Sequence, residues 1–105
     1  MQINELVQLA HNTAKQKGWH ETEKNDAECI ALMHSELSEA LEALRKPEQR
    51  DDHLPNLDPV GVELADVCIR IFDYCGLRGI DLEQCITEKM EYNLKRSYKH
   101  GGKKF

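Results

Sequence analysis

The sequence predicts an all-α protein with a single domain. Apolar residues recur with helical spacing in four segments, turn and capping residues separate these segments, and no stretch alternates apolar with polar residues as a half-buried strand would. The chain has 105 residues, of which 40% are hydrophobic and 31% charged, which suits one compact domain over residues 1–105. We expect a four- to five-helix bundle with mostly short links.

The first two helices have clear boundaries in the sequence. Residues 3–17 place apolar side chains on one face, and Gly18 follows them as a stop signal. The second helix, about 26–45, follows Asn25 as N-cap, with Glu28 three residues later as in a capping box. Its expected core stripe consists of Ile30, Met33, Leu37, Leu41 and Leu44.

Two more helices are expected after a flexible, charged loop at 46–57. Asp58 followed by Pro59 is an N-cap followed by proline at the first helical position, which starts a third helix that should run to about Cys75. Gly76 and Gly79 are expected to break it. A fourth helix at about 82–96 follows a capping aspartate, and a mobile basic tail at 97–105 ends the chain.

Composition disfavours a membrane protein and a cysteine-based site. The chain has no run of 18 apolar residues and no leader pattern at its N-terminus, so we expect a cytoplasmic protein without a membrane span. Its cysteines lack CxxC spacing and lie among apolar residues, so we expect small buried side chains, with neither zinc nor a disulfide. These cysteines are Cys29, Cys68, Cys75 and Cys85.

The net charge of −5 conceals a division along the chain. Residues 1–88 carry 8 basic and 18 acidic side chains, a net charge of −10, whereas residues 89–105 carry 6 basic and 1 acidic side chain, a net charge of +5. The basic end favours an anionic partner, but the acidic remainder would repel a nucleic acid polymer. A small phosphorylated ligand that bridges a metal site and the basic end does not meet this objection.

The third helix carries acids on a surface that is otherwise almost entirely apolar. Glu63, Asp66 and Asp73, with Arg70 among them, fall within one narrow strip at 3.6 residues per turn. We expect so apolar a helix to be buried in an oligomer, since a small monomer would not cover it. Buried carboxylates persist when they are paired, protonated or bound to a metal. For Asp73 we expect an ion pair with Arg70, one turn away.

Two acidic pairs predict a metal site. Glu36 and Glu39 in the second helix have the same three-residue spacing as Glu63 and Asp66 in the third. If the helices pack antiparallel, the four carboxylates converge, and charges about 5 Å apart repel by roughly 3 kcal/mol at an effective dielectric of about 20. Two divalent ions would balance them, and oxygen-only ligands favour Mg²⁺, with Mn²⁺ as a substitute. The alternative of solvated surface acids suits Glu39 better than Glu63 and Asp66.

Another carboxylate-rich bundle, the di-iron class, is disfavoured. Its metal ligands come from Glu-x-x-His pairs. No such pair occurs in this chain. Redox chemistry is therefore not expected.

Polar side chains on the fourth helix predict a phosphate-binding surface. Its inward stripe continues from apolar residues through Lys89, Asn93 and Arg96, where core residues would be expected. Arginine and lysine suit phosphate oxygens. Lys103 in the tail is expected to fold over a bound ligand. Trp19, where the first helix ends, suits stacking on a nucleobase or, alternatively, anchoring of that turn to the core.

These motifs together resemble the MazG-like all-α nucleoside triphosphate pyrophosphohydrolases over nearly the whole chain. The likeness rests on Gly18-Trp19, HSELSEALEAL, VELADVCIRIFDY, the GlyIleAsp turn at 79–81 and KMEYNLKRSYKHGGKKF from residue 89. One departure is Ser35, where many members have an additional glutamate directly before the first motif glutamate. This departure bears on the detailed metal geometry, not on the reaction.

The resemblance implies Mg²⁺-dependent cleavage of a (deoxy)nucleoside triphosphate to the monophosphate and pyrophosphate, for house-cleaning or control of nucleotide pools, in a homodimer or homotetramer. The metal ligands would be Glu36, Glu39, Glu63 and Asp66, one of which also steers the attacking water, and the phosphate-binding residues would be Lys89, Asn93, Arg96 and Lys103. Two alternatives remain, a phosphoribosyl-ATP pyrophosphohydrolase and a non-catalytic helical oligomer that binds nucleotide or protein.

Overall fold

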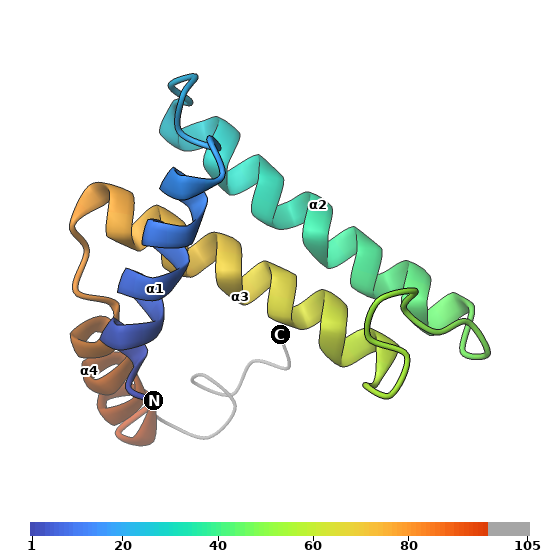
Figure 1. The fold of residues 1–105 in the computed structure, drawn as a ribbon. Coiled ribbons are helices and arrows are strands. Elements are labelled where there is room, and N and C mark those ends of the chain that lie inside the picture. The colour runs from blue at the N-terminus through green and yellow to red at the C-terminus, as the bar shows by residue number, and fades with distance from the viewer. Residues whose placement is uncertain (97–105) are drawn as a thin grey trace.

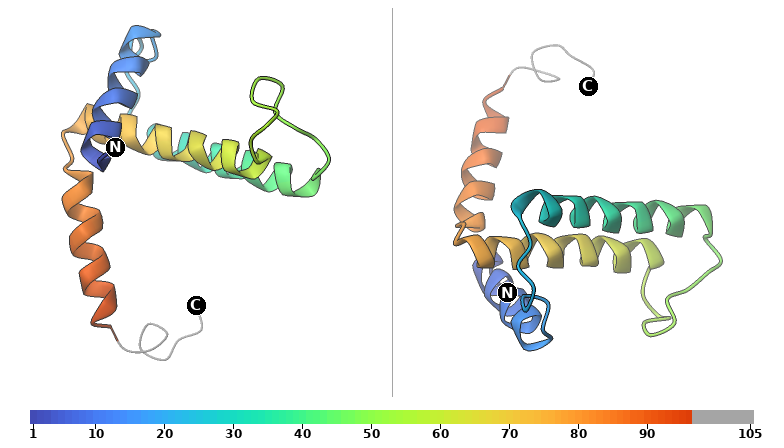
Figure 2. Two further views of the ribbon diagram at one scale, coloured as in Figure 1. Left: turned by 60° about the horizontal axis from the view of Figure 1, so that its bottom comes forward. Right: turned by 90° about the horizontal axis from the view of Figure 1, so that it is seen from above.

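The computed structural model describes residues 1–96, which form four α-helices and no strand. The helices are α1 (Ile3–Gln16), α2 (Asp26–Arg45), α3 (Pro59–Arg78) and α4 (Leu82–Leu94). Figure 1 shows α2 and α3 side by side and antiparallel, with α1 crossing α3. In Figure 2, α4 turns away from the α2–α3 pair. The prediction of an all-helical fold is therefore confirmed for these residues.

The helix boundaries follow the capping residues. The side-chain oxygens of Asn25, Asp58 and Asp81 accept hydrogen bonds from backbone N–H groups in the first turns of α2, α3 and α4. After α1 and α3, Gly18 and Gly79 adopt φ values of +80° and +68°, the left-handed region that favours glycine. The caps fix where α2, α3 and α4 begin, as the sequence predicted.

The expected break at Gly76 is wrong, because α3 continues through this residue to Arg78. A Cβ atom at position 76 would lie 2.5 Å from the Cβ of His11 on α1, closer than side chains approach one another. The missing side chain therefore lets α1 cross α3 closely. Gly76 is a packing residue, and Gly79 is the residue at which the helix stops.

The face that α2 turns toward α3 also differs from the prediction. Ile30, Leu37 and Leu41 are 44%, 48% and 50% exposed, although they belong to the expected core stripe. Met33 of that stripe is partly covered, and the other covered residues of α2 are Cys29, Leu32, Glu36, Ala40, Glu42 and Ala43. The alanines among them let the two helices approach closely, and Glu36 finds an ionic partner on α3. The larger aliphatic stripe stays on the surface of the single chain.

The third helix is less covered than its composition predicts. Only Val67 and Cys75 of α3 are buried, whereas Leu64 is 45% exposed. Cys68 and Cys85 are exposed as well, so the expectation of buried cysteines is wrong for these two. Within one chain, α3 therefore keeps uncovered apolar surface of the kind that protein partners bind.

The fourth helix is attached at its N-terminal end. The side chain of Asn4 donates to Asp81 Oδ1 at 3.0 Å and accepts from the backbone N–H of Glu83 at 3.3 Å. Every residue of α4 beyond Ile86 is exposed, so the predicted inward stripe is wrong within one chain. The stripe does not reach the core because α4 packs mainly against α1. None of the four helices described is both long and apolar enough to cross a bilayer.

Candidate functional site

Three carboxylates from two helices converge where α2 and α3 run side by side. One oxygen each from Glu36, Glu63 and Asp66 lies within 4.8 Å of the others. Glu36 and Glu63 are half-buried, and Asp66 is exposed. Antiparallel packing of α2 on α3 brings together three of the four carboxylates that the sequence predicted, without Glu39, and we refer to the three as the acidic cluster.

Two further acids surround the acidic cluster. Glu39 and Glu63 line a polar hollow of about 340 Å³ between the end of α2, the following loop and the start of α3. Asp51 of the loop lines the same hollow, and its Oδ1 accepts backbone hydrogen bonds of 2.8 Å from His53 and Leu54. Sequence reasoning missed Asp51, because a loop without periodicity gives no signal about where its side chains lie.

The crowding of negative charge raises the pKa of two carboxyls. Removal from water raises the pKa of Glu63, and the charges of Asp66, Glu39 and Glu36 raise it further. Burial is also the largest cause of the raised pKa of Asp66, to which Glu36 adds, while Arg70 acts in the opposite direction. Both carboxyls therefore gain more from a bound proton or cation than isolated carboxyls do.

Arg70 is the cation already present at the acidic cluster. Its Nε donates to Glu36 Oε1 at 2.8 Å, and both side chains are largely covered. Its guanidinium carbon also lies 5.9 Å from the ring centre of Trp19, within the range of a cation–π contact. The predicted pair between Arg70 and Asp73 is wrong, because Arg70 reaches across to α2 whereas Asp73 faces α1.

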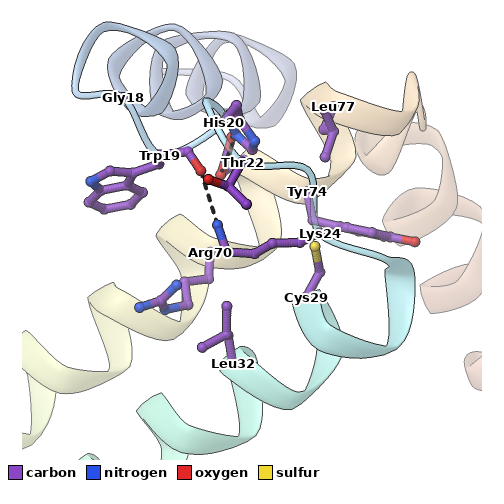
Figure 3. A pocket seen from close by; sticks show the side chains of 11 residues that line it. Gly18, Trp19, His20, Thr22, Lys24, Cys29, Leu32, Arg70, Tyr74 and Leu77 are labelled. Carbon is purple, nitrogen blue, oxygen red and sulfur yellow. Dashed lines mark hydrogen bonds and ion pairs between the residues drawn. The ribbon is translucent and has the colours of Figure 1, made fainter.

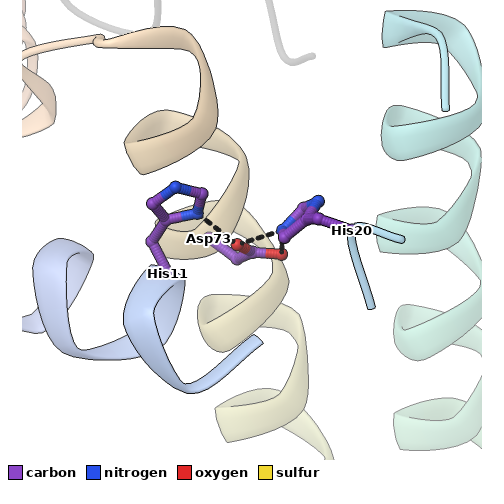
Figure 4. A group of neighbouring side chains, drawn as sticks. All are labelled: His11, His20 and Asp73. Atoms are coloured by element: carbon purple, nitrogen blue, oxygen red, sulfur yellow. Dashed lines mark hydrogen bonds and ion pairs between the residues drawn. The ribbon is translucent and has the colours of Figure 1, made fainter. Parts of the chain in front are cut away.

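Asp73 lies instead between two histidines, as Figure 4 shows. Its Oδ1 accepts hydrogen bonds from His11 Nδ1 at 2.9 Å and from His20 Nε2 at 2.8 Å, and its Oδ2 lies 3.0 Å from the same His20 nitrogen. The side chains of His11, Asp73 and His20 are 11%, 13% and 23% exposed. We call these three residues the histidine cluster.

The sequence carries a signal for the histidine cluster that the predictions above do not use. His11 shares the buried face of α1 with Val7 and Ala14, at i, i+4 and i+7 spacing. Asp73 likewise lies on a helix that is otherwise apolar. A polar group on a buried apolar face needs a hydrogen-bonding partner. Two such residues on different helices are therefore expected to form a hydrogen bond with each other.

A cavity of about 420 Å³ lies beside the histidine cluster and reaches Arg70, and Figure 3 shows the side chains around it. Trp19 and Tyr74 give this cavity aromatic walls, and Arg70 and Lys24 give it positive charge. The side chain of Trp19 borders the cavity and the residue is 48% exposed, so it does not anchor the turn in the core. Stacking of Trp19 on a base remains a prediction.

The predicted phosphate-binding residues of α4 lie apart from the acidic cluster. Lys89 on α4 and Arg96, two residues after its end, approach the ring of Tyr92 at 4.8 Å and 5.7 Å from its centre. Asn93 is exposed on that helix, which projects away from α2 and α3 (Figure 2). One chain therefore does not bring these side chains to the carboxylates. Lys103 lies outside the described residues 1–96.

Comparisons with known proteins do not assign this chain to a family. No protein-family model, no curated protein sequence and no solved structure matches it. The case for a function therefore rests on the motifs of the sequence and on the geometry of the acidic cluster.

Proposed function

We propose that this chain is a Mg²⁺-dependent nucleoside triphosphate pyrophosphohydrolase of the MazG-like type, which converts (deoxy)nucleoside triphosphates to monophosphates and pyrophosphate. The observation that supports the proposal is the convergence of Glu36, Glu63 and Asp66 within 4.8 Å. Glu39 lies close enough to raise the pKa of Glu63. Both acidic pairs of the sequence therefore contribute residues to the proposed site.

The residues of the acidic cluster fit Mg²⁺. Every candidate ligand atom is a carboxylate oxygen, the donor type that hard divalent cations prefer. The raised pKa values of Glu63 and Asp66 indicate negative charge that Arg70 balances only in part. A divalent cation would relieve the remaining repulsion more fully than one arginine does.

Each side chain of the site has a role in the proposed reaction. Bound Mg²⁺ would neutralise phosphate charge and lower the pKa of a coordinated water. Glu36, Glu63 and Asp66 bind and orient the ion, while Glu39, at the edge of the polar hollow, accepts the proton of the attacking water. Arg70 borders both the acidic cluster and the aromatic cavity, a position that suits a contact with the phosphate chain.

A second copy of the chain completes the proposed site in a homodimer or homotetramer. The exposed aliphatic stripe of α2 offers an apolar face for this association. Lys89 and Asn93 lie on α4, and Arg96 follows its end; this helix does not reach the carboxylates of its own chain. In the oligomer, α4 of one subunit would supply these groups to the phosphates bound by its neighbour.

Pyrophosphate release from a panel of nucleotides, with and without Mg²⁺, tests the proposal. We expect Mg²⁺-dependent release from nucleoside triphosphates, loss of release in Glu63→Gln, and unchanged release in Glu88→Gln, an exposed acid on α4. Release from phosphoribosyl-ATP alone would favour the related activity of histidine synthesis. Tight nucleotide binding without any release would favour a non-catalytic oligomer, and either of these results would contradict the proposal.

A further inference from the structure

We propose that the histidine cluster is a second metal site, which binds a transition metal ion such as Zn²⁺ through His11, His20 and Asp73. The site is independent of the acidic cluster and of the proposed hydrolase activity. Two imidazoles and one carboxylate make a mixed nitrogen and oxygen donor set. Such a set suits Zn²⁺ and similar borderline ions, whereas the oxygen-only acidic cluster suits Mg²⁺.

The spacing of the donor atoms is close to that of a tetrahedral ion. Metal–ligand bonds of about 2.0–2.1 Å place tetrahedral ligand atoms roughly 3.3 Å apart. Asp73 Oδ1 lies 2.9 Å from His11 Nδ1 and 2.8 Å from His20 Nε2, and all three donor atoms lie within 4.8 Å of one another. The two printed separations are 0.4–0.5 Å shorter than the tetrahedral value of about 3.3 Å, so small side-chain rotations suffice to seat an ion.

The donors come from three separate segments and are held in place before an ion arrives. His11 lies on α1 with its Cβ packed over Gly76 of α3, Asp73 lies on α3, and His20 lies in the turn between α1 and α2. The two imidazole rings are 5.3 Å apart between centres and are inclined by 59°. A bound ion would therefore tie the turn after α1 to the centre of the fold.

The proposed site has an accessible side. A tetrahedral ion with three protein ligands keeps a fourth position for water or another small ligand. His20 and Asp73 line the cavity of about 420 Å³, whereas His11 is on the buried side of the cluster. The fourth position would therefore face the cavity. The expectation of no zinc rested on the spacing of the cysteines, and this donor set contains none.

Zn²⁺ titration calorimetry in the presence of excess Mg²⁺ tests the proposal on the full chain. We expect one saturable Zn²⁺ site per chain, and binding about tenfold weaker or worse in His20→Gln and in Asp73→Asn. Glu63→Gln removes a ligand of the acidic cluster, and His34→Gln removes an exposed histidine of α2, so both should keep the Zn²⁺ affinity of the wild type. Equal Zn²⁺ affinity in the wild type and in His20→Gln/Asp73→Asn would overturn the proposal.

X-ray absorption at the zinc edge of the wild-type protein gives a second test that needs no variant. We expect scattering from two imidazoles with Zn–N distances of about 2.0–2.1 Å. This measurement decides the question if a substitution at Asp73 disturbs folding, which far-UV circular dichroism would reveal. Absence of saturable Zn²⁺ binding, or a spectrum without imidazole scattering, would overturn the proposal.

Discussion

The acidic cluster and the histidine cluster share α3 but balance their charges differently. Asp73 accepts hydrogen bonds from two histidines, so its carboxylate is satisfied by the chain itself. About two turns earlier, Asp66 and Glu63 lie among like charges that raise their pKa values, and Arg70 compensates this crowding only in part. The same helix thus carries one carboxylate that is hydrogen-bonded without an added ion and two that are left among like charges.

This difference predicts how substitutions in each cluster affect the metal-free fold. A set of carboxylates that repel one another weakens the metal-free fold, so its presence is best explained by an ion or ligand that it binds. A carboxylate with hydrogen-bonded partners supports the fold whether or not an ion is bound. Substitutions in the two clusters should therefore have opposite effects on stability.

The largest expected effect is loss of turnover without loss of fold. Glu63→Gln or Asp66→Asn should lower pyrophosphate release by about 10²- to 10³-fold or more, because each removes a ligand of the proposed ion. The free energy of unfolding of the metal-free variants should stay the same or rise slightly, because repulsion is removed. Urea denaturation in the presence of a chelator measures this free energy of unfolding, and Glu88→Gln serves as the control. A large loss of metal-free stability would show that these acids are structural.

A substitution beneath the histidine cluster should have the opposite pattern. In Gly76→Ala the new Cβ would lie 2.5 Å from the Cβ of His11, so α1 must shift, at a cost of about 1–3 kcal/mol in the free energy of unfolding. Mg²⁺ binding by the acidic cluster should be retained. Gly61→Ala is the matched control, because its nearest contact would be 3.6 Å from Asp58, and it should stabilise the helix by about 0.5–1 kcal/mol. Unchanged stability in Gly76→Ala would contradict the packing described.

Arg70 links the two regions and should compete with Mg²⁺. Arg70→Gln removes the cation that pairs with Glu36, so Mg²⁺ should bind the metal-free protein about 3- to 10-fold more tightly. Turnover should nevertheless fall if Arg70 contacts the phosphates as proposed. Arg70→Lys keeps the charge and should change Mg²⁺ affinity less. Equal Mg²⁺ affinity in wild type and Arg70→Gln would show that the ion binds elsewhere.

The smallest expected effect is on the pH dependence of stability. A carboxyl whose pKa is raised by folding binds its proton more tightly in the folded chain, so its contribution to stability improves as the pH falls through the folded pKa. For Glu63 and Asp66 this applies to the metal-free protein. The stability gained in Glu63→Gln/Asp66→Asn over wild type should therefore shrink as the pH falls from neutral toward the ordinary carboxyl pKa of about 4. A gain that stays constant with pH would contradict the raised pKa values.

The sequence predicted the helix boundaries and the acidic cluster better than it predicted the contacts between helices. Capping residues such as Asn25 and Asp81 act locally, so they can be read from the neighbouring residues. The partner of Asp73 and the face of α2 that packs on α3 depend on which helices meet. On α2 the covered residues include the small Ala40 and Ala43, whereas the larger Leu37 and Leu41 stay exposed.

Lys89 and Arg96 show a second feature that the sequence alone could not predict, namely which chain their partner belongs to. Polar residues on an apolar stripe predict a partner but not the chain to which it belongs, and within one chain α4 leaves both side chains exposed. The glycine at position 76 was read as a helix breaker because helix propensity is local, whereas its use here depends on a contact with His11.

Calorimetric titration of Mg²⁺ in the presence of a non-hydrolysable nucleoside triphosphate analogue tests most directly whether the carboxylates of α2 and α3 form a metal site. We predict saturable binding by the wild-type protein, tightened by the analogue, and no saturable binding by Glu63→Gln. Equal Mg²⁺ binding by the two proteins would contradict a metal site at these carboxylates. So would the absence of Mg²⁺ binding by the wild type both with and without the analogue.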